Sequence, residues 1–92
     1  MLVAQDLRAV PLTVHVPLRD VPALLTAEVI LSQARVVARD LSRFFAIANP
    51  RIAFTGLNPH AGENGAMGRE EIDVIIPALR QLKAEGLNVS GP

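Results

Sequence analysis

The segment between Thr26 and Asn49 constrains the fold most, because its apolar residues recur at the spacing of an α-helix. Thr26 is a suitable N-cap, and an acidic residue in the first turn suits the helix dipole. We therefore predict an amphipathic helix of about five turns. It is expected to end near residues 48–50, because Pro50 disfavours helical geometry in the residue before it. The predicted buried face carries Ile30, Ala34, Val37, Leu41 and Phe44 or Phe45, and the opposite face carries Glu28, Ser32, Arg35, Arg39 and Arg43.

Segments with strand character flank this helix on both sides. Residues 10–16 are rich in β-branched side chains and follow a short apolar run at 1–4, which predicts a hairpin or a turn into a strand. Residues 51–57 predict a second strand after the helix. Because strand, helix and strand follow one another, we predict a βαβ unit with both strands parallel in one sheet.

The remainder of the chain is a glycine-rich loop at residues 58–68, followed by a second helix. This helix is expected to begin at 69–71, to kink or restart at Pro77, and to end before Gly86. Residues 88–92 are expected to be only a connection. Together these patterns predict an α/β fold built in layers, as a single segment that covers residues 1–92.

Composition excludes several classes of function. Nine Lys and Arg balance nine Asp and Glu, and the basic residues are scattered, so no nucleic-acid partner is expected. The absence of cysteine removes disulfides, zinc–thiolate sites and thiol nucleophiles, and it is compatible with a reducing cytoplasm. The apolar runs are far too short to span a bilayer, so we expect a soluble protein with neither signal peptide nor membrane anchor.

The two histidines are the strongest candidates for chemistry. His15 lies near the end of the first predicted strand and His60 follows the second, so both imidazoles are expected at the carboxyl edge of the sheet, where α/β folds place ligands. Two neutral imidazoles there can share a zinc, magnesium, cobalt or manganese ion. A third ligand is then needed, from Asp20, from Glu63 or from outside the chain. The alternative is that both are ordinary loop histidines hydrogen-bonded to the backbone.

The other polar and glycine-rich features have simpler interpretations. Gly62, Gly65 and Gly68 could help to seat a phosphate at the start of the following helix, but a tight loop with positive φ explains them more simply. Residues 69–71 predict a solvated helix start. Asp20 could orient a ligand histidine through a hydrogen bond, although capping the next turn is the simpler role. Serine and threonine have no histidine partner in a nucleophile arrangement, so covalent catalysis is not expected.

Three motifs carry a resemblance to a known family. They are His-Val-Pro-Leu-Arg-Asp-Val-Pro at 15–22, Gly-Leu-Asn-Pro-His-Ala-Gly-Glu at 56–63 and Gly-Arg-Glu-Glu-Ile-Asp at 68–73. Through them the chain resembles the 4-hydroxythreonine-4-phosphate dehydrogenase family of vitamin B6 biosynthesis, over essentially its whole length, and the Asn-Pro-His-Ala-Gly-Glu string is highly specific. Asn64 departs from the family pattern, which usually has glycine there; this should alter loop flexibility more than chemistry.

The resemblance implies that His15 and His60 are two of three histidines that bind a divalent metal ion, namely zinc, magnesium or cobalt. The third histidine belongs to a Tyr-His-Asp-Gln-Gly-like segment that is absent from this sequence. The chain is therefore expected to be the central metal-binding part of a larger dehydrogenase with an isocitrate/isopropylmalate dehydrogenase-like α/β fold. Met1 is then an internal methionine or a mis-assigned start.

The resemblance further implies a cytoplasmic homodimer with active sites at the subunit interface. Such an enzyme uses NAD to oxidise the secondary hydroxyl of 4-phosphohydroxythreonine, and loss of carbon dioxide then gives 3-amino-2-oxopropyl phosphate on the route to pyridoxine 5'-phosphate. The isolated chain is expected to be inactive, because substrate-binding residues are missing too. Two alternatives stay open: a family relative that oxidises another phosphorylated hydroxy acid or a cyclic dihydrodiol dicarboxylate, and a non-catalytic remnant or assembly module.

Overall fold

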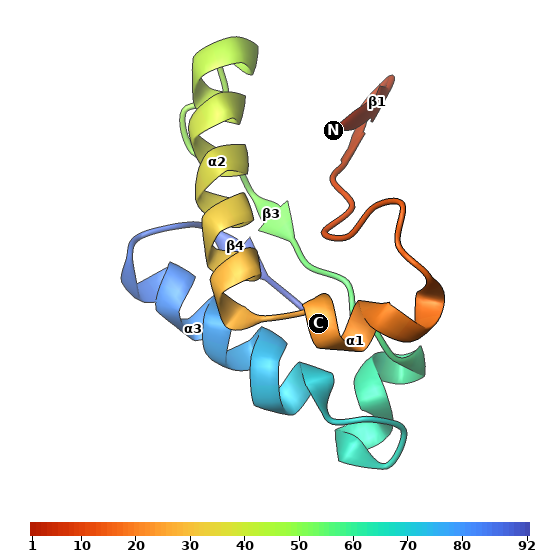
Figure 1. Cartoon of the computed structure of the whole chain (residues 1–92). Helices are drawn as coiled ribbons and strands as arrows, with labels where there is room; N and C mark the ends of the chain where they lie inside the picture. Colours follow the sequence, from red (N-terminus) through yellow and green to blue (C-terminus); the bar gives the residue numbers. More distant parts are fainter.

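The computed structural model describes residues 1–92, which form a mixture of helices and short strands (Figure 1). This mixture agrees with the predicted α/β composition. The strands are β1 Leu2–Ala4, β2 Leu7–Ala9, β3 Ile52–Ala53 and β4 Val89–Ser90. The helical segments are η1 Leu18–Asp20, α1 Val21–Leu24, α2 Ala27–Phe45, η2 Pro59–Gly65, η3 Glu71–Ile75 and α3 Ile76–Ala84.

Helix α2 is the predicted amphipathic helix, and its beginning is confirmed. The Thr26 hydroxyl accepts a hydrogen bond from the Val29 N–H at 3.3 Å, as an N-cap should. The predicted end is wrong by a few residues, because α2 ends at Phe45. Ala46 adopts a left-handed conformation with φ 56°, and the Ile47 N–H then bonds the Leu41 carbonyl at 3.2 Å. This local turn therefore ends the helix before the chain reaches Pro50.

The predicted buried face of α2 is confirmed over most of its length. Ile30, Ala34 and Leu41 are buried, whereas Phe44 and Phe45 at the end of the helix are exposed. This last turn extends beyond α3 and the β3–β4 pair (Figure 1), and neither ring belongs to the buried cluster. Phe45 instead lies under the Arg8 guanidinium, whose central carbon is 5.0 Å from the centre of the ring.

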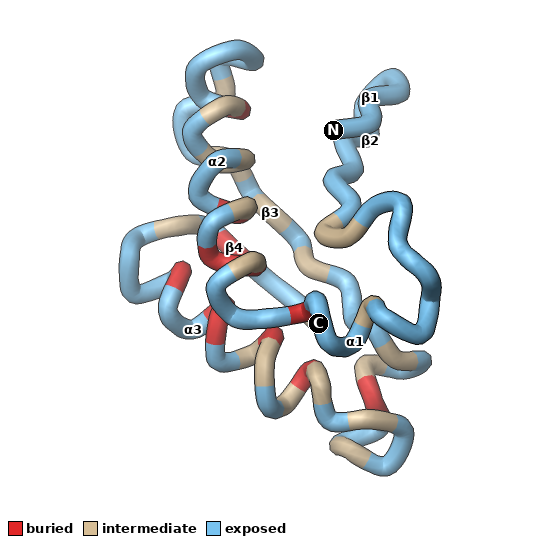
Figure 2. The backbone as a smooth tube through the Cα atoms, viewed as in Figure 1, coloured by how far each residue is buried: buried red, intermediate tan, exposed pale blue.

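The first predicted strand, residues 10–16, is wrong. The hairpin forms earlier, as antiparallel β1 and β2 with Leu2 opposite Ala9, and residues 10–17 continue as irregular backbone. Strand propensity is realised only where a partner strand lies alongside, and Pro11 has no N–H to donate to one. Every residue of the hairpin is exposed (Figure 2), although the Arg8 side chain of β2 reaches Phe45 at the end of α2.

A parallel strand pair exists, but it joins β3 to β4. Ile52 is opposite Val89 and Ala53 is opposite Ser90, and the Ile52 N–H donates to the Asn88 carbonyl at 2.9 Å. The βαβ unit therefore runs from β3 through α3 to β4, and the expectation of a mere connection at 88–92 is wrong. The predicted strand at 51–57 pairs over two residues only, because its partner β4 is equally short.

The core lies where α2, α3 and β4 meet (Figure 2). Pro77 is in the first turn of α3, directly after the π-helical turn η3, which confirms the predicted restart. Gly86, with φ 92°, ends the helix as predicted, and the Leu87 N–H bonds the Leu82 carbonyl at 3.0 Å. The buried cluster consists of Leu25, Ile30, Leu31, Ala34, Ile75, Ala78, Leu79, Leu82 and Val89.

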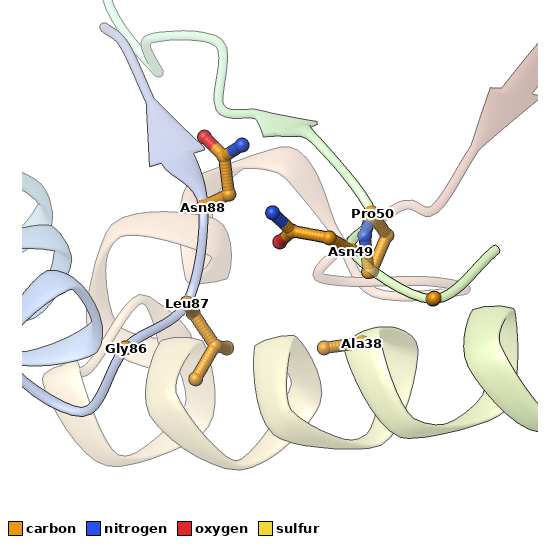
Figure 3. A pocket seen from close by; sticks show the side chains of 7 residues that line it. Ala38, Asn49, Pro50, Gly86, Leu87 and Asn88 are labelled. Atoms are coloured by element: carbon orange, nitrogen blue, oxygen red, sulfur yellow. The ribbon is translucent and has the colours of Figure 1, made fainter.

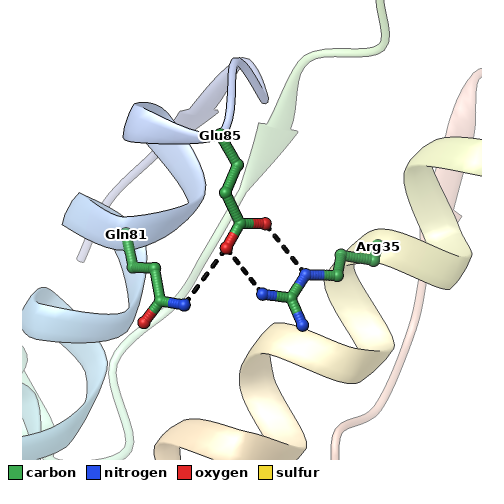
Figure 4. A network of polar contacts seen from close by, with 3 residues as sticks. All are labelled: Arg35, Gln81 and Glu85. Atoms are coloured by element: carbon green, nitrogen blue, oxygen red, sulfur yellow. Dashed lines mark hydrogen bonds and ion pairs between the residues drawn. The ribbon is translucent and has the colours of Figure 1, made fainter.

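A polar network joins α2 to the end of α3 on the surface (Figure 4). The Arg35 guanidinium donates two hydrogen bonds to the Glu85 carboxylate, at 2.8 and 2.6 Å, and Gln81 donates a third at 3.1 Å. The hydrogen bond from Arg35 holds the pKa of Glu85 below its ordinary value. The network links the two helices at the surface of the protein.

No single helix is long and apolar enough to cross a membrane. Segments 18–24 and 27–45 meet the limits of length and composition only when taken together, and they are bent by 86° at the break between them.

Candidate metal-binding site

The loop that carries His60 follows the carboxyl end of β3, where open α/β sheets hold their ligands (Figure 1). Its central part, η2, is wound in the left-handed sense. From His60 to Gly65 the φ angles are 51°, 53°, 82°, 47°, 55° and 96°. Left-handed backbone costs about 1–2 kcal/mol for each residue other than glycine, so four of these six residues are held against their preference. Such strain persists only where surrounding contacts enforce it.

Backbone hydrogen bonds close the turns of this loop. The Ala61 N–H donates to the Asn58 carbonyl at 3.1 Å, and the Met67 N–H donates to the Gly62 carbonyl at 3.0 Å. The predicted tight glycine loop with positive φ is therefore confirmed at Gly62, Gly65 and Gly68.

Glu71 lies under the loop with 1% of its surface exposed. Its Oε1 accepts the N–H groups of Leu57 and Asn58, each at 2.7 Å, and its Oε2 accepts the Asn58 side-chain amide at 3.0 Å. Burial raises the pKa of Glu71, but the hydrogen bonds from Asn58 and Leu57 outweigh burial, and the resulting pKa lies below the ordinary value. Glu71 is therefore a buried carboxylate that is stabilised by N–H donors.

Three glycines make room for this arrangement. A Cβ at Gly56 would lie 3.0 Å from Glu71 Oε1, and one at Gly62 would lie 3.0 Å from Glu71 Oε2 and 2.6 Å from the Gly68 carbonyl oxygen. A Cβ at Gly68 would lie 2.3 Å from the Asn58 amide nitrogen. The loop backbone therefore packs directly on the Glu71 and Asn58 side chains, and larger residues at these glycines would force it away.

His60 projects from the left-handed turn with 77% of its side chain exposed. Its Nδ1 lies 2.6 Å from Glu63 Oε1. A neutral imidazole that donates from Nδ1 to this carboxylate leaves the lone pair of Nε2 for a metal ion. A histidine oriented by a carboxylate in this way is a common metal ligand. The chemistry of this imidazole therefore fits the predicted role.

His15 is also exposed, in the irregular segment before η1, with φ 55°. The expected sheet edge with a strand at 10–16 is not formed, so the two histidines do not end neighbouring strands. Asp20 occupies the N-cap position of α1, but its side chain makes no capping hydrogen bond. No three His, Asp or Glu side chains of the chain lie together in a group that could hold a metal ion. The shared metal ion of His15 and His60 stays a prediction.

The hollow beside Ala38 lies elsewhere, at the amino ends of β3 and β4 (Figure 3). Its lining contains no histidine and no charged residue, so it does not compete with the loop as a candidate site. The residues that line it are Ala38, Ala48, Asn49, Pro50, Gly86, Leu87 and Asn88.

The predicted solvated helix start at 69–71 is wrong for Glu71, the one buried charged residue. A signal for its burial is present in the sequence. Glu71 precedes Ile75 by four positions and Ala78 by seven, so helical spacing places all three on one face, and both apolar residues are buried. Glu70, by contrast, is half-buried and accepts a hydrogen bond from the Asn58 amide at 2.6 Å.

The chain is a mixed α/β arrangement with a histidine-bearing loop after a parallel strand, and comparison with known proteins identifies its family. The model of the family described as pyridoxal phosphate biosynthetic protein PdxA matches residues 1–92. The chain belongs to this family.

Named relatives agree with this assignment. A 4-hydroxythreonine-4-phosphate dehydrogenase from Zymomonas mobilis is 60% identical over 92 residues, which are 100% of this chain and 28% of that protein. The crystal structure of the enzyme of the same name from Klebsiella pneumoniae has a TM-score of 0.81 and 42% identity, covering 85% of this chain and 24% of the other. The chain thus spans little more than a quarter of the length of its Zymomonas mobilis relative.

A solved structure with a different name is similar as well. The terephthalate 1,2-cis-dihydrodiol dehydrogenase from Burkholderia xenovorans has a TM-score of 0.78 and 36% identity, covering 85% of this chain and 25% of the other. The shared fold therefore occurs in proteins named for different substrates.

Acid is expected to remove the stabilisation that the Glu71 charge provides. The folded-state pKa of Glu71 lies below its ordinary value of 4.5, so this contribution is complete above pH 4.5 and is lost as the pH falls through the lowered pKa. Glu71→Gln has no titrating group at this position. Urea unfolding of both proteins should give a difference in unfolding free energy that is constant near neutral pH and shrinks in acid. A difference that grows on acidification would contradict the assignment.

Proposed function

We propose that this chain is the central metal-binding part of a larger metal- and NAD-dependent 4-hydroxythreonine-4-phosphate dehydrogenase in the biosynthesis of pyridoxal phosphate. The reaction would oxidise the secondary hydroxyl of 4-phosphohydroxythreonine, with hydride transfer to NAD, and release carbon dioxide to give 3-amino-2-oxopropyl phosphate. The observation that carries this proposal is 60% identity, over all 92 residues, to a protein of that name. The dehydrogenase would have the isocitrate/isopropylmalate dehydrogenase-like fold and act as a cytoplasmic homodimer with active sites at the subunit interface.

Within this function, His60 and His15 would be two ligands of a divalent metal ion, zinc, magnesium or cobalt. His60 would bind through Nε2, because Nδ1 is engaged by Glu63 at 2.6 Å. The third ligand would come from outside these 92 residues, since no group of three suitable side chains forms within them. A bound divalent ion supplies Lewis-acid chemistry: it favours loss of the hydroxyl proton and stabilises negative charge on oxygen.

The residues of this chain would then position the ion rather than move protons. A histidine whose Nε2 lone pair is committed to a metal and whose Nδ1 proton is held by Glu63 has no free site for a transferred proton. The exposure of His60 keeps it accessible to substrate and to ligands from other parts of the protein.

A chimera tests this function directly. The chain replaces the matching 92 residues of the Zymomonas mobilis relative, which supplies the remaining length. We expect the chimera to form NADH from NAD and 4-phosphohydroxythreonine in the presence of a divalent metal ion, followed by absorbance, and to lose this activity with a chelator. The unaltered relative is the control for expression and assay. A folded chimera that forms no NADH would contradict the proposal.

A second substrate is favoured by one specific observation, the 0.78 TM-score to the dihydrodiol dehydrogenase. The same assay with a cyclic cis-dihydrodiol dicarboxylate separates the two substrate classes, because the preferred one has the higher kcat/KM. A folded, metal-binding chimera without activity on either compound, or on other phosphorylated hydroxy acids, would favour a non-catalytic assembly module.

A further inference from the structure

We propose that Glu71, together with Asn58, is a positioning residue that holds His60 in the left-handed conformation from which its imidazole reaches a metal ion. The inference rests on the proposed metal role of His60. It assigns to that site residues that contact the His60 loop and not the metal ion, on the basis of contacts within this chain.

The first step is that His60 cannot hold its conformation alone. His60, Ala61, Glu63 and Asn64 all have positive φ, a state that L residues other than glycine disfavour. The bond between His60 and Glu63 is made by two exposed side chains, and exposed pairs of this kind are weak. The restraint must therefore come from buried contacts at the ends of the segment.

The second step is that Glu71 binds the chain at residues 57 and 58, directly before the left-handed segment that begins at His60. Its carboxylate binds the N–H of Leu57, the N–H of Asn58 and the Asn58 amide, at 2.7, 2.7 and 3.0 Å. Asn58 passes the restraint on, because its carbonyl accepts the Ala61 N–H at 3.1 Å. Only Pro59, whose ring fixes φ, separates Asn58 from His60.

The third step is that the same pair contacts the far side of the loop. Gly62 packs against Glu71 Oε2, and Gly68 packs against the Asn58 amide, so closely that neither position has room for a Cβ. Glu71 and Asn58 thus contact the segment both before and after His60. The glycine spacing at 62 and 68, which matches no nucleotide-binding motif, is explained by this contact.

The fourth step concerns why a carboxylate is present. Glu71 is buried on an otherwise apolar face and makes no ion pair, and every one of its recorded loop partners is an N–H group of Leu57 or Asn58. A buried charge is costly, and an apolar side chain of similar volume is often at least as stabilising. Stability alone therefore does not require a carboxylate at this position. Fixing three N–H donors at the loop entrance, by contrast, requires a hydrogen-bond acceptor, and Glu71 is that acceptor.

The test compares Glu71→Gln with Asp73→Asn in the chimera. Both variants remove one carboxylate from the same helical segment, but Asp73 is exposed and bonds only Arg69. Glutamine keeps the shape of glutamate and places an NH₂ group against the Asn58 amide, so two donors face each other. The readouts are amide hydrogen exchange of residues 57–68 and the affinity for Zn²⁺ alone by equilibrium dialysis.

In Glu71→Gln we expect exchange at 57–68 to be about 10- to 100-fold faster, as for loss of a charged hydrogen bond. Zn²⁺ affinity should fall by about 10- to 100-fold, as for loss of a residue that orients a ligand. Exchange in α2 should match that of Asp73→Asn, which separates a local effect from general destabilisation. If Glu71→Gln fails to fold, Asn58→Ala, which leaves both backbone bonds to Glu71, should show the same changes to a smaller extent.

Two results would overturn the inference: loop exchange in Glu71→Gln equal to that in Asp73→Asn, or faster loop exchange with unaltered Zn²⁺ affinity. A different failure concerns the proposed function. If the unsubstituted chimera binds no Zn²⁺ through His60, the metal role is wrong, and the exchange data still decide whether Glu71 holds the loop.

Discussion

Replacing His60 with alanine is expected to lower the Zn²⁺ affinity of the chimera by at least about a hundredfold, the upper end of the loss seen when only a supporting residue is removed. NADH formation should be lost in parallel. The free energy of unfolding should change little, because 77% of the His60 side chain is exposed and no core contact is removed. Equilibrium dialysis, the absorbance assay and urea unfolding measure the three quantities on one preparation.

The matched control for His60→Ala is Asn64→Ala. Asn64 lies in the same left-handed segment with φ 55°, is exposed, and has no proposed contact with the metal ion. Its replacement should therefore reproduce any backbone effect of alanine without the loss of a ligand. Equal Zn²⁺ affinities of His60→Ala and the unsubstituted chimera would show that His60 is no ligand.

Leu82→Ala is expected to destabilise the 92-residue chain by about 2–5 kcal/mol, the usual loss for a buried leucine that leaves a cavity. Leu82 is 0% exposed and lies in α3 within the cluster that also contains Ile30 and Val89. Small domains are stable by only about 5–15 kcal/mol, so this one change removes a large share. Urea unfolding followed by circular dichroism measures it.

Leu18→Ala removes the same atoms from a side chain that is 85% exposed, and it should change the unfolding free energy by less than about 0.5 kcal/mol. Equal losses at Leu82 and Leu18 would mean that the α2–α3–β4 cluster is not the core of the folded chain.

The sequence predicts the helices well because their signals are local. The hydroxyl of Thr26, the helical spacing of Ile30, Ala34 and Leu41, and Gly86 after the last turn all act within a few residues of the feature they define. Helix formation and helix termination depend mainly on such neighbours, and packing against α3 follows from the apolar face they create.

The strands could not be assigned in the same way. Residues 10–16 have the composition of a strand but no partner, whereas Val89 and Ser90 form a strand because β3 lies alongside. Pairing joins residues far apart in the chain, so composition does not decide it. Because no strand forms at 10–16, the predicted position of His15 at the edge of the sheet is also wrong.

The sequence pointed to the candidate site through its exposed histidines, but the role of the buried Glu71 was not predicted. His60 is conspicuous by residue type, but Glu71 resembles any acidic residue in a first helical turn. Its role becomes visible only when the backbone N–H groups of Leu57 and Asn58 are placed within 2.7 Å of its oxygen. Such contacts depend on the three-dimensional path of the loop.

The reversed winding of η2 also limits which amino acids the loop can accept. Between His60 and Asn64 the backbone has the mirror image of ordinary helical geometry, so chirality ranks the residues there: glycine first, then asparagine, and β-branched side chains last. Asn64, with φ 55°, is among the residues that tolerate this conformation best, whereas a valine or isoleucine at the same place would be among the least favoured. Handedness, as much as chemistry, therefore decides which sequences can present an imidazole from this loop.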